Sequence, residues 1–135
     1  MNASFEDAGK LVLRLLVGGL LILHGLHKVF TGPAMIAGML THHGWPGFFA
    51  WAVYLGEVLG PLLVIVGLYT RVGGLLILVN MIVATLLAYG GNAWHLNPYG
   101  GWVVELEAFY GAGGLAILLL GAGRYSIGGA HGRYN

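Results

Sequence analysis

The first long apolar segment of the chain, residues 10–30, reads KLVLRLLVGGLLILHGLHKVF. Three further apolar segments follow at residues 47–69, 72–89 and 101–120. A helix of about 20 apolar residues, rising about 1.5 Å per residue, spans the ~30 Å hydrocarbon core of a bilayer. Each segment is close to the length that one crossing requires, so the sequence predicts four membrane-spanning segments.

The composition supports a membrane protein made of helices. Of the 135 residues, 58% are hydrophobic and only 8% are Asp, Glu, Lys or Arg. In lipid, only helices and closed barrels satisfy their backbone hydrogen bonds, and no segment alternates strictly between apolar and polar residues as a barrel strand does. Four helices that are apolar on every side would need a much larger soluble protein around them. We therefore expect an all-α fold, an integral membrane four-helix bundle that forms a single domain over residues 1–135.

Net charge and cysteine content exclude several classes of function. The formal net charge is +1, so we expect no nucleic-acid partner and expect membrane lipid to surround the spans. The chain has no cysteine, which excludes disulfides, thiolate metal sites and cysteine-based catalysis within it.

The basic residues are unevenly divided between the two sides of the predicted bundle. With four spans, both termini and the turn between the second and third segments share one side. Five basic residues lie there, while the other side holds only Lys28: they are Lys10, Arg14, Arg71, Arg124 and Arg133. By the positive-inside rule, both termini are expected in the cytoplasm. Arg14 lies about one turn inside this edge, and we expect its side chain to snorkel to the interface.

The first outer loop, residues 31–46, contains a second kind of helical signal. After Pro33, the apolar residues Met35, Ile36, Met39 and Leu40 are spaced like one face of a short helix. We expect this helix to lie on, or dip into, the outer surface of the membrane.

Ionisable side chains inside the spans are the strongest signal of a site. At the bilayer centre a charged side chain costs about 2.5–3.5 kcal/mol on insertion scales, so such groups usually pair, face the bundle interior or serve a function. Five ionisable side chains lie in the outer half of the predicted bundle, on three different spans: His24, Lys28, Glu57, Glu105 and Glu107. Counted from the outer aromatic residues, His24 and the glutamates lie about 5–14 Å deep. The sequence therefore predicts a polar pocket open to the outside.

Helix geometry places some of these groups together. His24 and Lys28 are four residues apart and share one face of their helix. Pro61 has no amide proton, so the backbone oxygen of Glu57 loses its usual donor beside its own carboxylate. Lys28, His24, water or a polar ligand would satisfy these groups. Glu105 and Glu107 point about 200° apart, so only one of them faces the pocket, and periodicity leaves the choice open.

Neither haem nor a metal ion is expected in this chain. Histidines occur on only one span, whereas a bundle haem usually takes axial ligands from two facing helices. The outer loops contain His42, His43 and His95, but without the close spacing of metal ligands.

The order of several motifs resembles the DoxX family of small four-helix bacterial membrane proteins. Residues 24–28, HGLHK, resemble the HGxxK stretch of that family, and residues 56–60, GEVLG, follow in the second span. Residues 121–126, GAGRYS, are similar to the closing GPGRxS, with Ala122 in place of proline, and Pro61 is a second departure. The resemblance implies the bacterial cytoplasmic (inner) membrane and selects Glu105 over Glu107 as the pocket carboxylate. It also implies an accessory role in sulfur and quinone redox chemistry, as in the small subunit of thiosulfate:quinone oxidoreductase.

These observations lead to a functional hypothesis. We expect a membrane subunit of a redox assembly that binds a quinone-like or small sulfur-containing ligand through His24, Lys28, Glu57 and Glu105. In this hypothesis His24 passes protons, Lys28 holds an anionic group, and the carboxylates of Glu57 and Glu105 orient both, so His24, Glu57 and Glu105 are the predicted catalytic residues. The sequence leaves the cofactor unidentified, with quinone as one candidate. A redox partner protein or a bound carrier supplies electrons, and a homo-oligomer is the other expected assembly.

Two other functions stay open at the level of sequence. The polar groups would also suit a non-catalytic scaffold or assembly factor in which an internal salt-bridge network holds the helices together. A proton-coupled or metal-ion carrier is the weaker alternative. Because the chain has no detectable inverted repeat, such a carrier would have to oligomerise.

Overall fold

The computed structural model describes residues 3–135, and this part of the chain is helical apart from its loops and turns. Its five α-helices are α1 (Ala3–Thr31), α2 (Ala34–His42), α3 (Gly60–Val66), α4 (Thr70–Ala88) and α5 (Glu105–Leu120). Three short helices of other types connect them: the 3₁₀-helices η1 (Gly47–Ala52) and η3 (Gly90–Asn92), and the π-helical turn η2 (Leu55–Leu59). The prediction of an all-α fold is confirmed.

Three of the four predicted spans are long and apolar enough to cross a membrane. They are Ser4–Thr31, Gly47–Val66 and Thr70–Ala88, close to the predicted ranges 10–30, 47–69 and 72–89. The second of them ends early because Gly67 adopts a left-handed conformation, with φ at 74°, that terminates α3.

The fourth predicted segment, residues 101–120, forms a shorter helix than expected. Helix α5 begins at Glu105 and has 16 residues, which corresponds to about 24 Å at about 1.5 Å per residue. The four residues before it belong to a turn in which the amide oxygen of Asn97 accepts a hydrogen bond from the Gly101 backbone N–H at 3.0 Å. Trp102 also forms an antiparallel bridge with Leu96. These loop contacts delay the start of the helix.

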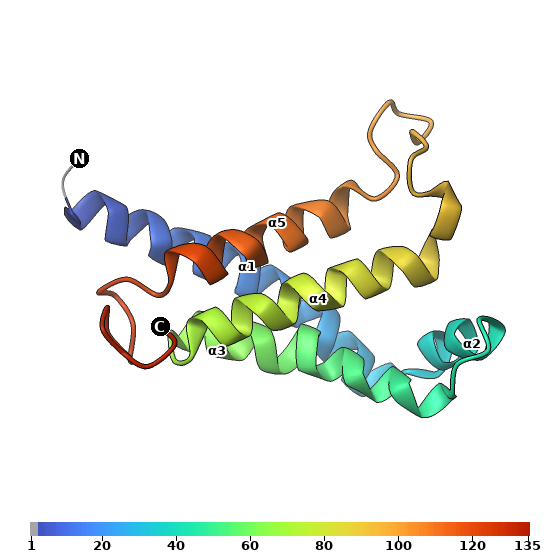
Figure 1. Ribbon diagram of the computed structural model, residues 1–135, viewed down its shortest axis with the longest axis horizontal. Helices are drawn as coiled ribbons and strands as arrows, with labels where there is room; N and C mark the ends of the chain where they lie inside the picture. The colour runs from blue at the N-terminus through green and yellow to red at the C-terminus, as the bar shows by residue number, and fades with distance from the viewer. Residues whose placement is uncertain (1–2) are drawn as a thin grey trace.

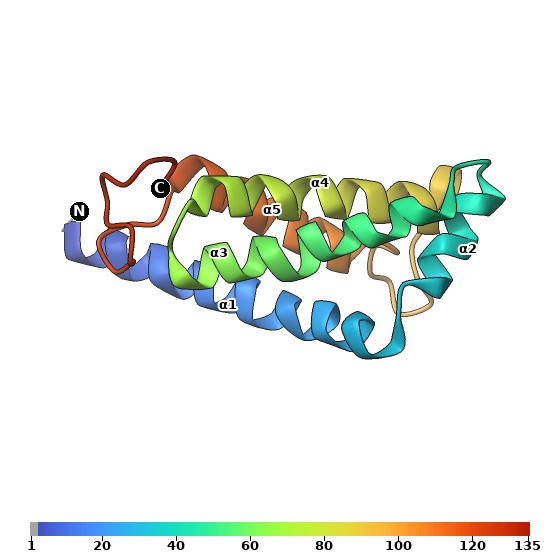
Figure 2. The same cartoon turned by 90° about the horizontal axis from the view of Figure 1, so that it is seen from below.

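The long helices run side by side along the molecule. In Figures 1 and 2 both termini lie at one end, while α2 and the loop that precedes α5 lie at the other. The placement of both termini on one side of a membrane stays a prediction. Helix α2 is the short helix expected in the first outer loop, and it packs against η1 and α4.

Small residues bring α4 and α5 together. A Cβ added at Gly74 would lie 2.6 Å from the Gly114 carbonyl oxygen, and one added at Gly114 would lie 2.8 Å from the Gly74 carbonyl oxygen. The two backbones are therefore in direct contact, as small residues allow in membrane helices. A cluster of buried apolar side chains from α1, α3, α4 and α5 lies around this contact: Leu21, Val64, Ile77, Met81 and Ile117.

Arg14 contradicts the prediction that it snorkels to the membrane interface. Its side chain is only 1% exposed, and its guanidinium donates hydrogen bonds of 2.8–2.9 Å to four backbone carbonyls. Two acceptors, Val64 and Ile65, belong to the last turn of α3, where helix carbonyls have no partner within the helix. The other two, Ala122 and Tyr125, belong to the segment that follows α5. The depth of Arg14 in its predicted span did not reveal these carbonyl acceptors.

Candidate functional site

Glu57 lies in the π-helical turn η2, where α1 approaches most closely. In this turn the N–H of Gly60 donates to the carbonyl of Leu55, one residue further back than in an α-helix. Gly25 is the residue of α1 that faces this turn, and a Cβ added to it would collide with the Glu57 carbonyl. Because Gly25 has no side chain, α1 lies directly against η2, and Lys28, one turn further along α1, reaches Glu57.

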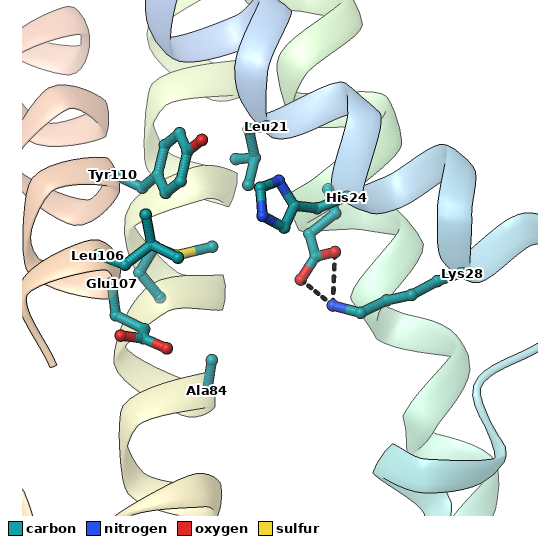
Figure 3. Close-up of a pocket in the computed structure, with 9 residues that line it drawn as sticks. Leu21, His24, Lys28, Ala84, Leu106, Glu107 and Tyr110 are labelled. Atoms are coloured by element: carbon teal, nitrogen blue, oxygen red, sulfur yellow. Dashed lines mark hydrogen bonds and ion pairs between the residues drawn. The ribbon is translucent and has the colours of Figure 1, made fainter. Parts of the chain in front are cut away.

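The Lys28 ammonium and the Glu57 carboxylate form a bidentate ion pair. Lys28 Nζ lies 2.5 Å from Oε1 and 2.6 Å from Oε2 of Glu57. The dashed lines that meet at the Lys28 nitrogen in Figure 3 mark these two contacts. The Glu57 side chain is 5% exposed and that of Lys28 is 24% exposed. A buried carboxylate needs such a partner, because an unpaired charge in a low-dielectric interior is strongly destabilising. Among the partners that the sequence left open for Glu57, namely Lys28, His24, water or a polar ligand, the structure has Lys28.

Asn80 of α4 adds a third element to the ion pair. Its Nδ2 donates to Glu57 Oε1 at 3.3 Å, and an added Cβ at Gly56 would collide with the Asn80 side chain. The hydroxyl of Tyr54, the residue before η2, donates to the Lys28 carbonyl at 2.8 Å. Lys28 is thus held at its backbone by Tyr54 and at its ammonium by Glu57. Glu57 is thus bound from α1 and from α4.

The ion pair forms one wall of a cavity of about 120 Å³ between α1, η2, α4 and α5. Figure 3 shows these side chains facing the same space. The cavity is lined by Leu21, His24, Lys28, Glu57, Met81, Ala84, Leu106, Glu107 and Tyr110. Polar groups from three elements therefore meet at one place, with apolar walls between them. At about 30 Å³ per water molecule, this volume suits a few waters or a small planar group.

His24 lies on the α1 side of the cavity, one turn before Lys28. Its Nδ1 is 3.2 Å from the Leu20 carbonyl oxygen, and its ring meets that of Tyr110 edge to face at 5.8 Å between centroids. In the tautomer that carries a proton on Nδ1, this nitrogen donates to Leu20 and leaves Nε2 as an acceptor. An imidazole in this setting suits proton exchange with a group in the cavity.

The carboxylate of α5 in the cavity wall is Glu107, whereas the sequence resemblance selected Glu105. Glu105 is exposed in the first turn of α5, and its carboxylate lies beside Gly101 in the preceding loop. The two side chains leave the helix about 200° apart, and the packing of α5 against α4 turns Glu107 inward. The structure therefore brings together His24, Lys28 and Glu57 and leaves Glu105 outside.

Glu107 has an unsatisfied atom at the cavity. Its Oε2 is buried and has no hydrogen-bond partner among residues 3–135.

Sequence reasoning missed the parts played by Asn80 and Tyr110. Asn80 is an amide in the middle of an otherwise apolar span, and the cost of burying an amide in lipid is the signal that would have identified it. Tyr110 carries no comparable signal, since tyrosines are common near the ends of spans. Among residues 3–135, no three His, Asp or Glu side chains are grouped so that they could hold a metal ion.

Comparisons with known proteins support the resemblance seen in the sequence. The DoxX family model matches residues 9–90, more than half of the chain, a region that includes His24, Lys28, Glu57 and Asn80 but not α5. A curated relative from Bacillus subtilis (strain 168), named "Putative oxidoreductase CatD", is 37% identical over 86 residues, which cover 64% of this chain and 63% of the relative. The match thus spans less than two thirds of that relative's length. No solved structure matches the chain. With more than half of its length matched by the family model, this chain belongs to the DoxX family.

Proposed function

We propose that the chain is a membrane subunit of a redox assembly that binds a quinone-like or small sulfur-containing ligand in the cavity between α1, η2, α4 and α5. The observation that carries this proposal is the convergence of His24, the Lys28–Glu57 pair and Glu107 on one small cavity. The word oxidoreductase in the name of the relative supports a redox role.

Each group has a chemical task in this proposal. The ammonium of Lys28 has three N–H donors, of which two point at Glu57, and the third is available for a carbonyl or anionic oxygen of the ligand. His24 and Glu107 exchange protons with that ligand, and Glu107 takes the role that the sequence assigned to Glu105. Leu21, Met81 and the Tyr110 ring supply apolar contact to a planar group. Electrons come from a partner protein or a diffusible carrier.

The proposal also includes a membrane arrangement. We place α5 as a fourth crossing beside α4, with both termini on the cytoplasmic side of a bacterial inner membrane. The excess of basic residues near the termini supports this orientation. The cavity then lies in the outer half of the bilayer.

The test compares two glutamates on one helix. Glu107→Gln removes a proton-exchanging carboxylate from the cavity, whereas Glu105→Gln makes the same change two residues away, outside it. Both proteins are purified in nanodiscs, and binding of decylubiquinone and of thiosulfate is measured by calorimetry. We expect Glu107→Gln to weaken the binding of one of these ligands about tenfold, or about 1.4 kcal/mol, and Glu105→Gln to leave it unchanged. Equal effects of the two substitutions, or no binding of either ligand to the unaltered protein, would refute the proposal.

A scaffold or assembly factor is the second candidate function. It is favoured by the Lys28–Glu57–Asn80 contacts, which tie α1, η2 and α4 together whether or not a ligand binds. Substitution Glu57→Gln discriminates between the two functions. Loss of the protein from the membrane with no ligand-binding phenotype in Glu107→Gln favours the scaffold, whereas a stable protein that has lost ligand binding favours the redox subunit.

A further inference from the structure

A second hollow lies between the outer halves of α4 and α5, next to the polar cavity. It is a groove of about 390 Å³. Residues that line it include Leu78, Ile82 and Leu86 of α4, Ala108 and Ala112 of α5, and Trp102 of the loop before α5. It lies outward of the Gly74–Gly114 contact, where the two helix backbones touch.

The groove faces the side of the bundle that lipid would cover. Ile82 is 51% exposed and Leu86 is 62% exposed in the folded chain, and Ala112 is exposed as well. Small residues on α5 form its floor. At Gly111, an added Cβ would lie 3.5 Å from the Cβ of Met81, so α4 forms the opposite wall at van der Waals distance.

The groove and the polar cavity share two wall residues. Met81 of α4 and Glu107 of α5 line both spaces. Glu107 is the one ionisable residue among those that line the groove, and its buried Oε2 has no hydrogen-bond partner among residues 3–135. The two spaces are therefore adjacent, with Met81 and Glu107 between them.

We propose that the groove holds the hydrocarbon tail, isoprenoid or alkyl, of a lipid-soluble ligand whose polar ring occupies the cavity beside Lys28, His24 and Glu107. The ligand reaches the cavity laterally from the bilayer, between α4 and α5. This inference rests on the proposed function and narrows its ligand class, because a small water-soluble sulfur anion has no apolar part to place in the groove. The class of ligand is then a tailed quinone or a related amphiphile.

The experiment uses two probes with the same ring. Dimethoxymethylbenzoquinone has no tail, and decylubiquinone has the same ring with a decyl chain. Ala112→Phe places a bulky ring in the groove, and Ile82→Trp does so from the opposite helix. Ala52→Phe makes the same change as the first variant at an exposed position outside both spaces. Each probe is compared with itself across variants in identical nanodiscs, so partition of the decyl chain into lipid cancels.

We expect Ala112→Phe and Ile82→Trp to weaken decylubiquinone binding about tenfold, or about 1.4 kcal/mol, and to leave the tail-less quinone unaffected. Ala52→Phe should leave both probes unaffected. Equal weakening of both probes, or unchanged decylubiquinone binding, would overturn the tail site while leaving the proposed cavity intact. A change in oligomeric state or in co-purifying phospholipid, with quinone binding unaltered, would instead assign the groove to a second copy or a structural lipid. If neither quinone binds the unaltered protein, both this inference and the quinone form of the proposed function fail.

Discussion

At the residue scale, Arg14 shows how a charge is accommodated inside the bundle without a carboxylate. Its five N–H donors meet four carbonyl oxygens, two at the C-terminal end of α3 and two in the segment after α5. Helix C-terminal carbonyls carry partial negative charge, so they stabilise a cation at this position. The guanidinium thus joins α1, α3 and the end of the chain at a single point.

The first prediction concerns the shape of that group. Arg14→Lys keeps the charge but replaces a planar fork with a single ammonium, which has fewer donors and a different reach. We expect the folded protein to lose about 2–4 kcal/mol of stability, because buried carbonyls and a buried charge lose partners. Thermal unfolding in detergent measures the loss. Arg133→Lys, at an exposed position, is the matched control, and equal melting temperatures for the two variants would contradict the assigned role.

Residue-scale reasoning from sequence succeeded for neighbours on one helix. His24 and Lys28 share a face of α1 and line the same cavity, and Lys28 is the one of the open alternatives that pairs with Glu57. It failed for Arg14 because the acceptors lie 50 and 108 residues away in the sequence, at Val64 and Ala122. Depth in a span gives the cost of a charge but not the identity of its partners.

At the scale of the elements, the contact between α1 and η2 fixes the geometry of the ion pair. The π-helical turn presents Glu57 to α1, and Gly25 allows the two backbones to touch. A π-helical turn interrupts the regular α-helical ladder, and such turns often occur at functional sites. The position of Lys28 therefore depends on a residue that has no side chain.

The second prediction tests this contact with two glycines of one helix. Gly25→Ala would push α1 away from η2, so we expect a stability loss of about 1–3 kcal/mol and weaker ligand binding. Gly19→Ala is the control, because a Cβ at Gly19 meets no atom within 4 Å and alanine is the better helix former. Melting temperatures and quinone titrations of both variants give the answer. A Gly25→Ala protein as stable as Gly19→Ala would show that the close contact is dispensable.

The start of α5 explains why the sequence did not identify the cavity carboxylate. Apolar periodicity continues from residue 101, and it allowed either Glu105 or Glu107 to face inward. The turn held by Asn97 and Trp102 begins the helix at Glu105 instead. Such a turn depends on contacts within a loop, for which hydrophobic patterns contain little information.

At the scale of the whole molecule, both termini lie at the same end, and α2 and the loop before α5 lie at the other (Figure 1). This arrangement was predictable from the number of apolar segments. Five of the six Lys and Arg residues lie near the termini or in the first turn of α4. Their number sets the expected orientation, while the side-chain hydrogen bonds of Arg14, Arg71 and Arg124 hold that end together.

The third prediction tests the orientation by using the absence of native cysteine. Asn92→Cys and His131→Cys each introduce one thiol at an exposed position at opposite ends of the molecule. A membrane-impermeant maleimide should label Asn92→Cys in intact spheroplasts and label His131→Cys only after lysis, because the proposed arrangement places the basic end in the cytoplasm. The unaltered protein is the blank. Labelling of both thiols in intact spheroplasts would mean that α5 does not cross the bilayer.

The Arg14 contacts have a consequence for biogenesis. Ribosomes complete α1 long before they reach Ala122 and Tyr125, so the guanidinium enters the bilayer before two of its four acceptors exist. A chain that ends before Ala122 would hold a guanidinium with only two of its four acceptors, and we expect it to be degraded faster than the full chain.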